Sequence, residues 1–371
     1  MKANNFYKKL IVEILDNIAN QYNDNYDYLR FHKPTWRRKI KNHIKKKFRI
    51  KEFSLNNIYC KVSFIRLLPY LDGIVNLYEL LLDENSKYLL VQLITYKILG
   101  YEKYKLPLST TELWCGIAKI DKLKDLNDYI EVKFPGKNIK LYKYNLNELN
   151  IPLELYYTSS GIYNNIEIKQ YDYTTENINI KVQDDDIVLV CGACWGDTAL
   201  FFANEINKNG HVYSFEFIPG NIDVFNKNIG INPNLKEKIT LVPYPLDEIS
   251  DKKLYYIDNG PASRVSVDNF LDSQEVNTIC IDDFFDKYEL SRVNFIKMDI
   301  EGAELHSLKG AKKILEQFKP KLAISIYHSM DDFVNIAAYL HSLNLGYNFY
   351  LKHGTIHEEE TVLLAISSQC K

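Results

Sequence analysis

The 371-residue sequence predicts a mixed α/β fold whose C-terminal half contains a mostly parallel sheet. Short apolar, strand-like runs alternate there with helical stretches of about 10–15 residues, which is typical of βαβ units. The last two runs, residues 347–351 and 361–367, are too close together for an intervening helix, so one of them must be antiparallel. A composition of 46% hydrophobic and 25% charged residues excludes wholesale disorder.

Residues 1–112 are predicted to form a helical N-terminal region. Helices are expected at 75–82 and 86–99, and Gly100 is placed to end the second. Residues 113–183 are predicted to form a small β-rich connecting segment, because short β-like pieces alternate with turn residues. These pieces are 139–144, 153–158 and 166–173.

Residues 184–371 are predicted to form the α/β domain. Five strands, each followed by a helix or a long connection, and a closing hairpin give a seven-stranded sheet. The expected strands are 187–190, 211–216, 239–242, 293–298, 321–327, 347–351 and 361–367. Helices are expected through Lys208, through Ile229, at 303–317 and at 331–343.

The near-neutral formal charge of −2 conceals an uneven distribution. Residues 30–51 contain eleven Lys or Arg and no acid, which leaves 35 basic against 48 acidic residues, a net charge of −13, elsewhere. An apolar stripe on this basic helix predicts docking through residues 34–51 onto the acidic body, a protein partner or an anionic membrane surface. The acidic body argues against nucleic acid as a partner. The stripe is Trp36, Ile40, Ile44 and Phe48.

A cytoplasmic, reducing location is expected. The N-terminus lacks the continuous apolar core of a signal peptide, and no run approaches the roughly 18 apolar residues of a membrane span. The six cysteines are too scattered for a disulfide framework. Cys191 and Cys194 form a lone CxxC without further ligands at zinc spacing, so a tight turn of small residues is favoured.

A glycine-bearing turn follows the first strand of the α/β domain. Gly192 and Gly196 would let the backbone approach a ligand at the carboxyl edge of the sheet. Glu216, which ends the second strand, could accept hydrogen bonds from both ribose hydroxyls of a nucleoside cofactor. The turn lacks G-x-G-x-x-G, and Asp197 near the helix start would repel a pyrophosphate, so S-adenosylmethionine is favoured over NAD.

The most informative segment is the fourth strand and the residues after it. Lys297 precedes a cluster of acids, Asp299, Glu301 and Glu304, where a parallel sheet opens. Such charges are costly unless they bind a ligand, take part in chemistry or cap a helix. His328 ends the fifth strand and titrates near neutral pH by default, so it is a candidate base or a structural hydrogen-bonding group.

These segments strongly resemble the FkbM-type S-adenosylmethionine-dependent methyltransferases. The resemblance rests on KMDIEGAELHSLKGA at 297–311, GACWGDTAL at 192–200, SFE at 214–216 and KPKLAISIYH at 319–328. It covers residues 187–367, and residues 77–107 and 170–171 look like the N-terminal extension of longer members. It implies a Rossmann-like class I methyltransferase domain that methylates a hydroxyl of a sugar, a glycan or a related small molecule.

Site residues follow from the motifs and the resemblance together. Catalytic candidates are Asp299, His328, Lys297 and Glu301. Candidates for binding S-adenosylmethionine are Gly192, Ala193, Cys194, Trp195, Gly196, Asp197, Thr198, Glu216, Phe217 and Asp299. Asp299, Glu301 and Glu304 could supply oxygen ligands to magnesium, but their spacing does not require a metal, and none is assigned.

One position departs from the family pattern. Val190 stands where the family usually has an Asp that orients the methionine end of the cofactor, and Asp197 or Asp299 could supply that charge instead. The departure keeps a non-catalytic binding or scaffold protein open as an alternative. A nicotinamide-dependent oxidoreductase and a nucleic-acid methyltransferase are less favoured alternatives, and a homodimer is left open.

Overall fold

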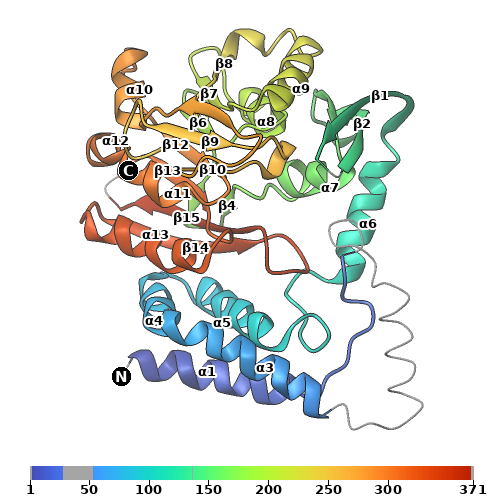
Figure 1. Cartoon of the computed structure of the whole chain (residues 1–371), viewed down its shortest axis with the longest axis vertical. Helices are drawn as coiled ribbons and strands as arrows, with labels where there is room; N and C mark the ends of the chain where they lie inside the picture. The colour runs from blue at the N-terminus through green and yellow to red at the C-terminus, as the bar shows by residue number, and fades with distance from the viewer. Residues whose placement is uncertain (1, 28–52, 136, 369–371) are drawn as a thin grey trace. The chain divides into compact units, whose positions relative to one another are not determined.

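The computed structural model describes residues 2–27, 53–135 and 137–368 (Figure 1). Docking through residues 34–51 therefore concerns residues outside those described. Two compact units are distinguished, one of residues 1–114 with 355–359 and one of residues 115–354 with 360–371. Among the described residues, no helix is both long and apolar enough to span a membrane.

The first unit is helical, as predicted. Its longest described helices are α1 (Lys2–Asn17) and α5 (Glu84–Leu99), which contact each other. Asp83 caps α5 by accepting a hydrogen bond from Ser86 N at 2.6 Å, and Gly100 at φ 78° ends it. The other predicted helix is α4, which runs from Leu71 to Leu80 rather than over 75–82. The unit also contains α3 (Phe53–Leu67), and α6 (Thr110–Asp121) leads into the second unit.

The connecting segment is partly as predicted. It forms an antiparallel sheet in the order β1-β2-β3, of which β1 was not predicted. The predicted strand at 166–173 is wrong: Thr158 caps the short helix α7 (Ser159–Ile162), which continues into the π-helical turn η3 (Tyr163–Glu167). Of the predicted strand, only the last residue, Tyr173, lies in a strand, β4, which pairs with β5. The bounds are β1 (Lys124–Phe134), β2 (Lys137–Asn145), β3 (Glu154–Tyr157), β4 (Tyr173–Thr174) and β5 (Asn179–Ile180).

The predicted seven-stranded sheet is confirmed within the described residues. Its order is β14-β15-β13-β12-β6-β7-β8, and β15 runs antiparallel to both of its neighbours. The four other pairings, from β13 to β8, are parallel, and helices or longer connections cross over between the strands. The strands are β6 (Ile187–Cys191), β7 (His211–Phe215), β8 (Ile239–Val242), β12 (Phe295–Met298), β13 (Lys321–Ser325), β14 (Tyr347–His353) and β15 (Thr361–Ser367).

Helices cover this sheet on two sides, and Figure 1 shows its strands between α10 and α12 on one side and α8 and α9 on the other. The helix predicted over 303–317 is interrupted at Gly310, where a Cβ would lie 2.5 Å from the carbonyl oxygen of Asp247. The helices are α8 (Asp197–Glu205), α9 (Pro219–Gly230), α10 (Ile281–Lys287), α11 (Glu304–Lys309), α12 (Lys312–Phe318) and α13 (Met330–Ser342).

A small antiparallel sheet, which was not predicted, is inserted between β8 and α10. Its order is β10-β9-β11, with β9 (Lys253–Tyr256), β10 (Val265–Ser266) and β11 (Gln274–Asn277). The link between β9 and β10 brings residues 260–265 to the carboxyl edge of the main sheet, where several of them line a cleft.

Candidate active site

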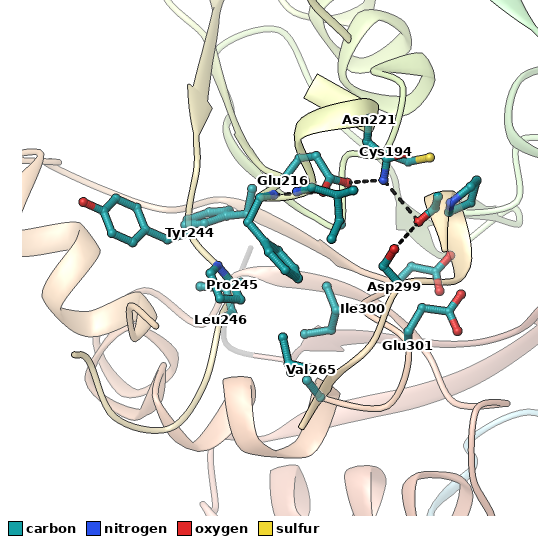
Figure 2. Close-up of a pocket in the computed structure, with 18 residues that line it drawn as sticks. Cys194, Glu216, Asn221, Tyr244, Pro245, Leu246, Val265, Asp299, Ile300 and Glu301 are labelled. Carbon is teal, nitrogen blue, oxygen red and sulfur yellow. Dashed lines mark hydrogen bonds between the residues drawn. The ribbon is translucent and has the colours of Figure 1, made fainter. Parts of the chain in front are cut away.

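A cleft opens where the parallel strands β6, β7 and β12 end, as expected for a ligand site in an open α/β sheet. It encloses about 590 Å³ of space that includes open solvent. Figure 2 shows Glu216, Asn221 and Cys194 along one part of it and Asp299 and Glu301 along another. Apolar and aromatic side chains complete the lining, among them Phe217, Ile218, Tyr244, Pro245, Leu246 and Val265.

The cleft is acidic. Glu216, Asp299 and Glu301 line it, and none of the lining residues described is a Lys, Arg or His. A pyrophosphate in this space would meet three carboxylates and no cation, whereas a cationic ligand would be attracted. The lining therefore suits a nucleoside compound that carries positive charge.

The turn between β6 and α8 packs tightly against the end of β12. Gly192 has φ 78°, and a Cβ there would lie 1.9 Å from the backbone oxygen of Asp299. The amides of Gly192 and Ala193 both donate to the carbonyl of Phe215, at 3.1 and 2.9 Å. Lys297 donates from Nζ to the Gly192 carbonyl at 2.9 Å. Glycine is therefore required at 192 for close approach of two backbone segments as well as for its φ.

Trp195 fixes the same turn from the other side. Its side chain is buried and packs with Val132 and Leu141, so the connecting sheet supports the turn. Its indole nitrogen donates to Asn221 Oδ1 at 3.1 Å. Asn221 in turn donates from Nδ2 to Glu216 Oε2 at 3.3 Å, which links the turn to the acid at the end of β7.

Glu216 is held in place by several donors. Its Oε1 accepts the amides of Phe217 and Ile218, both at 2.8 Å, and the carboxylate also accepts the amide of Cys194 (Figure 2). Burial of the side chain outweighs these hydrogen bonds and raises the pKa of Glu216 to about 7. Glu216 is thus a rigid acceptor at the cleft that changes charge near neutral pH.

Asp197 lies outside the residues that line the cleft. It accepts a hydrogen bond from Asn165 Nδ2 at 2.7 Å, and the Tyr157 hydroxyl is a second partner. Burial raises the pKa of Asp197 above its ordinary value. In this position Asp197 joins the first turn of α8 to the connecting segment, which makes Asp299 the better placed of the two acids to face a cofactor.

Asp299 lies at the centre of the acidic part of the cleft. Tyr171 donates to its Oδ2 at 2.9 Å, and Tyr327 donates to its Oδ1 at 3.3 Å. Burial alone would raise the pKa of Asp299, but the positive charges of Lys297 and His328 outweigh it and hold the pKa below its usual range. Asp299 therefore stays ionised at neutral pH.

His328 lies among three carboxylates. Its Nδ1 is 2.9 Å from Glu304 Oε1, and its Nε2 is 3.4 Å from Asp299 Oδ1 and 3.7 Å from Glu301 Oε2. Burial opposes the charged imidazole, but Glu304, Asp299 and Glu301 outweigh it and raise the pKa of His328 to about 9. A histidine expected to titrate near neutral pH therefore carries a proton there and is not free to accept another.

Glu301 and Glu304 have different surroundings. The Glu301 side chain is 25% exposed and pairs with Arg264 at 3.3 Å, and burial raises the pKa of Glu301 above its ordinary value. Glu304 is fully buried and accepts the amides of Ile300 and Gly302 at 2.8 and 2.9 Å. Glu301 can therefore meet a ligand, while Glu304 holds the turn after β12.

Of the residues singled out in the sequence, six line the cleft and seven do not. The six are Gly192, Cys194, Glu216, Phe217, Asp299 and Glu301. Ala193, Trp195, Gly196, Asp197 and Thr198 support the turn, and Lys297 and His328 lie behind Asp299. Sequence reasoning missed the partners Tyr157, Asn165, Tyr171, Asn221, Arg264 and Tyr327. All of these except Asn221, which is five residues from Glu216, lie 28 or more residues along the chain from the acids they contact, so their local signal is weak.

The fold and the cleft together define an α/β domain with an acidic cleft at the carboxyl edge of its parallel strands. Residues 190–349 match the family described as the methyltransferase FkbM domain. This match covers the segment in which the motifs lie and confirms their resemblance to the FkbM-type methyltransferases. A comparison with curated proteins gives no match.

Several solved structures are similar. The methyltransferase FkbM of Methylobacillus flagellatus KT is 19% identical, with a TM-score of 0.49 over 81% of this chain and 60% of that chain. This chain thus matches about three fifths of that protein's length. Fibrillarin of Aeropyrum pernix, described with bound S-adenosylmethionine, is 13% identical, with a TM-score of 0.32 over 51% and 70%. An O-methyltransferase of Bacillus cereus, in complex with SAH, is 12% identical, with a TM-score of 0.33 over 60% and 86%.

Proposed function

We propose that the protein transfers a methyl group from S-adenosylmethionine to a hydroxyl of a sugar, a glycan or a related small molecule. The observation that carries the proposal is the acidic cleft at the carboxyl edge of an FkbM domain. S-Adenosylmethionine combines an adenine, a ribose and a sulfonium cation. The apolar lining of the cleft suits the adenine, and Glu216 suits the ribose. The carboxylates of Asp299 and Glu301 suit the sulfonium cation.

The residues of the chain have distinct roles in this proposal. Glu216 accepts the ribose hydroxyls, and the turn from Gly192 to Gly196 leaves room for the cofactor beside Asp299. Trp195, Asp197 and Thr198 hold that turn. The family usually has an Asp at the position of Val190. In this chain the carboxylates of Asp299 and Glu301 supply the negative charge that faces the methionine end of the cofactor. S-Adenosylmethionine itself supplies the methyl group and a good leaving group.

Methyl transfer to a hydroxyl also requires removal of a proton. The acceptor O–H bond breaks as the new O–CH₃ bond forms and the CH₃–S bond breaks, so one proton must be accepted. Glu301 is the best placed acceptor, because it lines the cleft and burial raises its pKa above that of an ordinary Glu. Asp299 and His328 lie beside it and set the local charge, and Lys297 holds the Gly192 carbonyl.

The acceptor can be found by a screen with S-adenosylmethionine. Nucleotide sugars, free glycans and glycan oligomers are incubated with the protein and read by mass spectrometry. A methyl mass increment on one class, together with S-adenosylhomocysteine, supports the proposal. Binding of S-adenosylmethionine without any transfer favours the binding-protein alternative that Val190 suggested.

Asp299→Ala and His328→Ala should each lower turnover by about tenfold or more, because each removes a charge that sets the pKa of the proposed base Glu301. Both should lower the affinity for S-adenosylmethionine less than they lower turnover, because Glu216, Glu301 and the glycine turn remain to hold the cofactor. The measurement is kcat with the acceptor found above, beside calorimetric affinity. Asp331→Ala removes an exposed acid three residues from His328 and should leave both values unchanged. Wild-type turnover in both site variants would remove these residues from the mechanism.

The affinity for S-adenosylmethionine should rise with pH between 6 and 8. With a pKa of about 7, Glu216 changes from mostly protonated to mostly ionised, which predicts up to about tenfold tighter binding if the ionised form holds the ribose. The effect of Glu216 on stability has the opposite pH dependence. Because its pKa is raised from 4.5 in the unfolded chain to about 7 in the fold, its contribution to the free energy of unfolding is fully present below pH 4.5 and is lost as the pH rises through 7. Calorimetry across this range tests the point, and Glu216→Gln should flatten the profile. An unchanged slope in that variant would rule out Glu216.

A further inference from the structure

The acids behind the cleft converge on one buried histidine. The side chain of His328 is 3% exposed, and its Nε2 makes no hydrogen bond with any residue described. The nearest ligand atoms of Asp299, Glu304 and His328 all lie within 4.8 Å of one another. A buried ring nitrogen without a hydrogen bond, facing two carboxylates, is unusual, because buried polar groups are nearly always satisfied.

The distances around Nε2 are longer than hydrogen bonds but suit a shared ion. Nε2 is 3.4 Å from Asp299 Oδ1 and 3.7 Å from Glu301 Oε2. Two ligand atoms that are each about 2.1 Å from one metal ion lie roughly 3.0–3.7 Å apart at common coordination angles. Nε2 of His328 therefore lies at a ligand-to-ligand spacing from two carboxylate oxygens, one of Asp299 and one of Glu301.

The other side of the ring has the arrangement found behind metal-bound histidines. Nδ1 lies 2.9 Å from Glu304 Oε1, and Glu304 is itself fixed by the amides of Ile300 and Gly302. A carboxylate on the far nitrogen sets the tautomer and the orientation of a ligating imidazole. Tyr171 and Tyr327 orient Asp299 in the same way.

We propose that His328, Asp299 and Glu301 form a site for one divalent cation, which displaces the proton from Nε2 of the imidazole, with Glu304 orienting the ring. One nitrogen and two oxygens suit an ion that accepts mixed ligands, such as Mn²⁺, and leave coordination positions open toward the cleft. An acceptor hydroxyl bound there would have a lower pKa and would lose its proton more easily to a carboxylate oxygen that is not coordinated. That last role rests on the proposed function, whereas cation binding does not.

The test is a titration of the metal-stripped full-length protein with Mn²⁺, in which electron paramagnetic resonance measures the free ion. The wild type should bind one ion per chain. His328→Ala should bind at least tenfold more weakly, and Glu304→Gln should lose about 10–100-fold in affinity, the usual effect of removing the group that orients a ligating histidine. Asp299→Asn gives the same test should His328→Ala fail to fold, as judged by circular dichroism.

His306→Ala is the matched control. His306 lies 3.9 Å from Asp247 Oδ1 and 3.7 Å from Glu248 Oε2, but its side chain is 58% exposed. This variant should bind Mn²⁺ like the wild type. No stoichiometric binding by the wild type, or equal binding by wild type and His328→Ala, would overturn the site. Methyl transfer that persists in chelator would then leave the proposed function standing without the cation site. Conversely, binding of Mn²⁺ without binding of S-adenosylmethionine would support the cation site and contradict the proposed function.

Discussion

Gly192→Ala should abolish measurable binding of S-adenosylmethionine and lower the free energy of unfolding by about 2–4 kcal/mol. The new Cβ would lie 1.9 Å from the Asp299 carbonyl oxygen, which is backbone and cannot rotate away. The left-handed φ of 78° adds about 1 kcal/mol of strain to an overpacking cost of about 1–3 kcal/mol. The turn must then move away from β12, and the cleft lies between these two segments.

Gly230→Ala is the control for this change. A Cβ at Gly230, the last residue of α9, meets nothing within 4 Å. This variant should be as stable as the wild type or up to about 1 kcal/mol more stable, because alanine favours helix. Urea denaturation followed by circular dichroism measures both variants, and calorimetry measures the cofactor. Equal stability of the two alanine variants would show that the turn tolerates a side chain at 192.

Lys297→Met should lower the free energy of unfolding by about 3–5 kcal/mol, the usual effect of removing one partner from a buried charge network. Lys297 is 3% exposed, donates to the Gly192 carbonyl and lies with Nζ 5.1 Å from the centre of the Tyr171 ring. Its charge also helps to keep Asp299 ionised. Methionine fills most of the same space but leaves the Gly192 carbonyl without its donor and Asp299 with one cation fewer.

Lys312→Met is the matched control. The Lys312 side chain is 59% exposed, and its ion pair with Glu316 at 3.8 Å joins residues four apart on a helix surface. Its loss should change stability by no more than about 0.5 kcal/mol. Urea denaturation compares the two. A loss at position 297 as small as that at 312 would mean that Lys297 does not hold the turn to β12.

The main sheet could be predicted because each of its strands is marked locally. The run from Ile187 to Val190 is continuously apolar, which is typical of a buried parallel strand. The link between the last two strands is too short to contain a helix, which identifies an antiparallel pair. The inserted sheet from Lys253 to Asn277 could not be predicted, because its strands are only two to four residues long and few of their residues are buried. The strand predicted at 166–173 was wrong because Thr158 caps a helical segment just before it. The spacing of apolar residues does not indicate such a cap.

The positions of the acids at strand ends could also be predicted, but their charge states could not. Asp299 and Glu216 both follow apolar strands, yet Asp299 has a lowered pKa and Glu216 a raised one. The difference comes from the cations beside Asp299 and the burial of Glu216. The hydroxyl of Tyr171, 128 positions from Asp299, comes from the connecting segment, and no local pattern pairs such residues.

The central claim is that the acidic cleft binds S-adenosylmethionine. It is tested most directly by calorimetric titration of the full-length wild type with S-adenosylmethionine and, separately, with NAD. We expect S-adenosylmethionine to bind one molecule per chain with Kd of about 1–100 µM, in the range of ordinary enzyme–substrate affinities, and NAD to give no binding heat. No binding of S-adenosylmethionine, or tighter binding of NAD, would contradict the account.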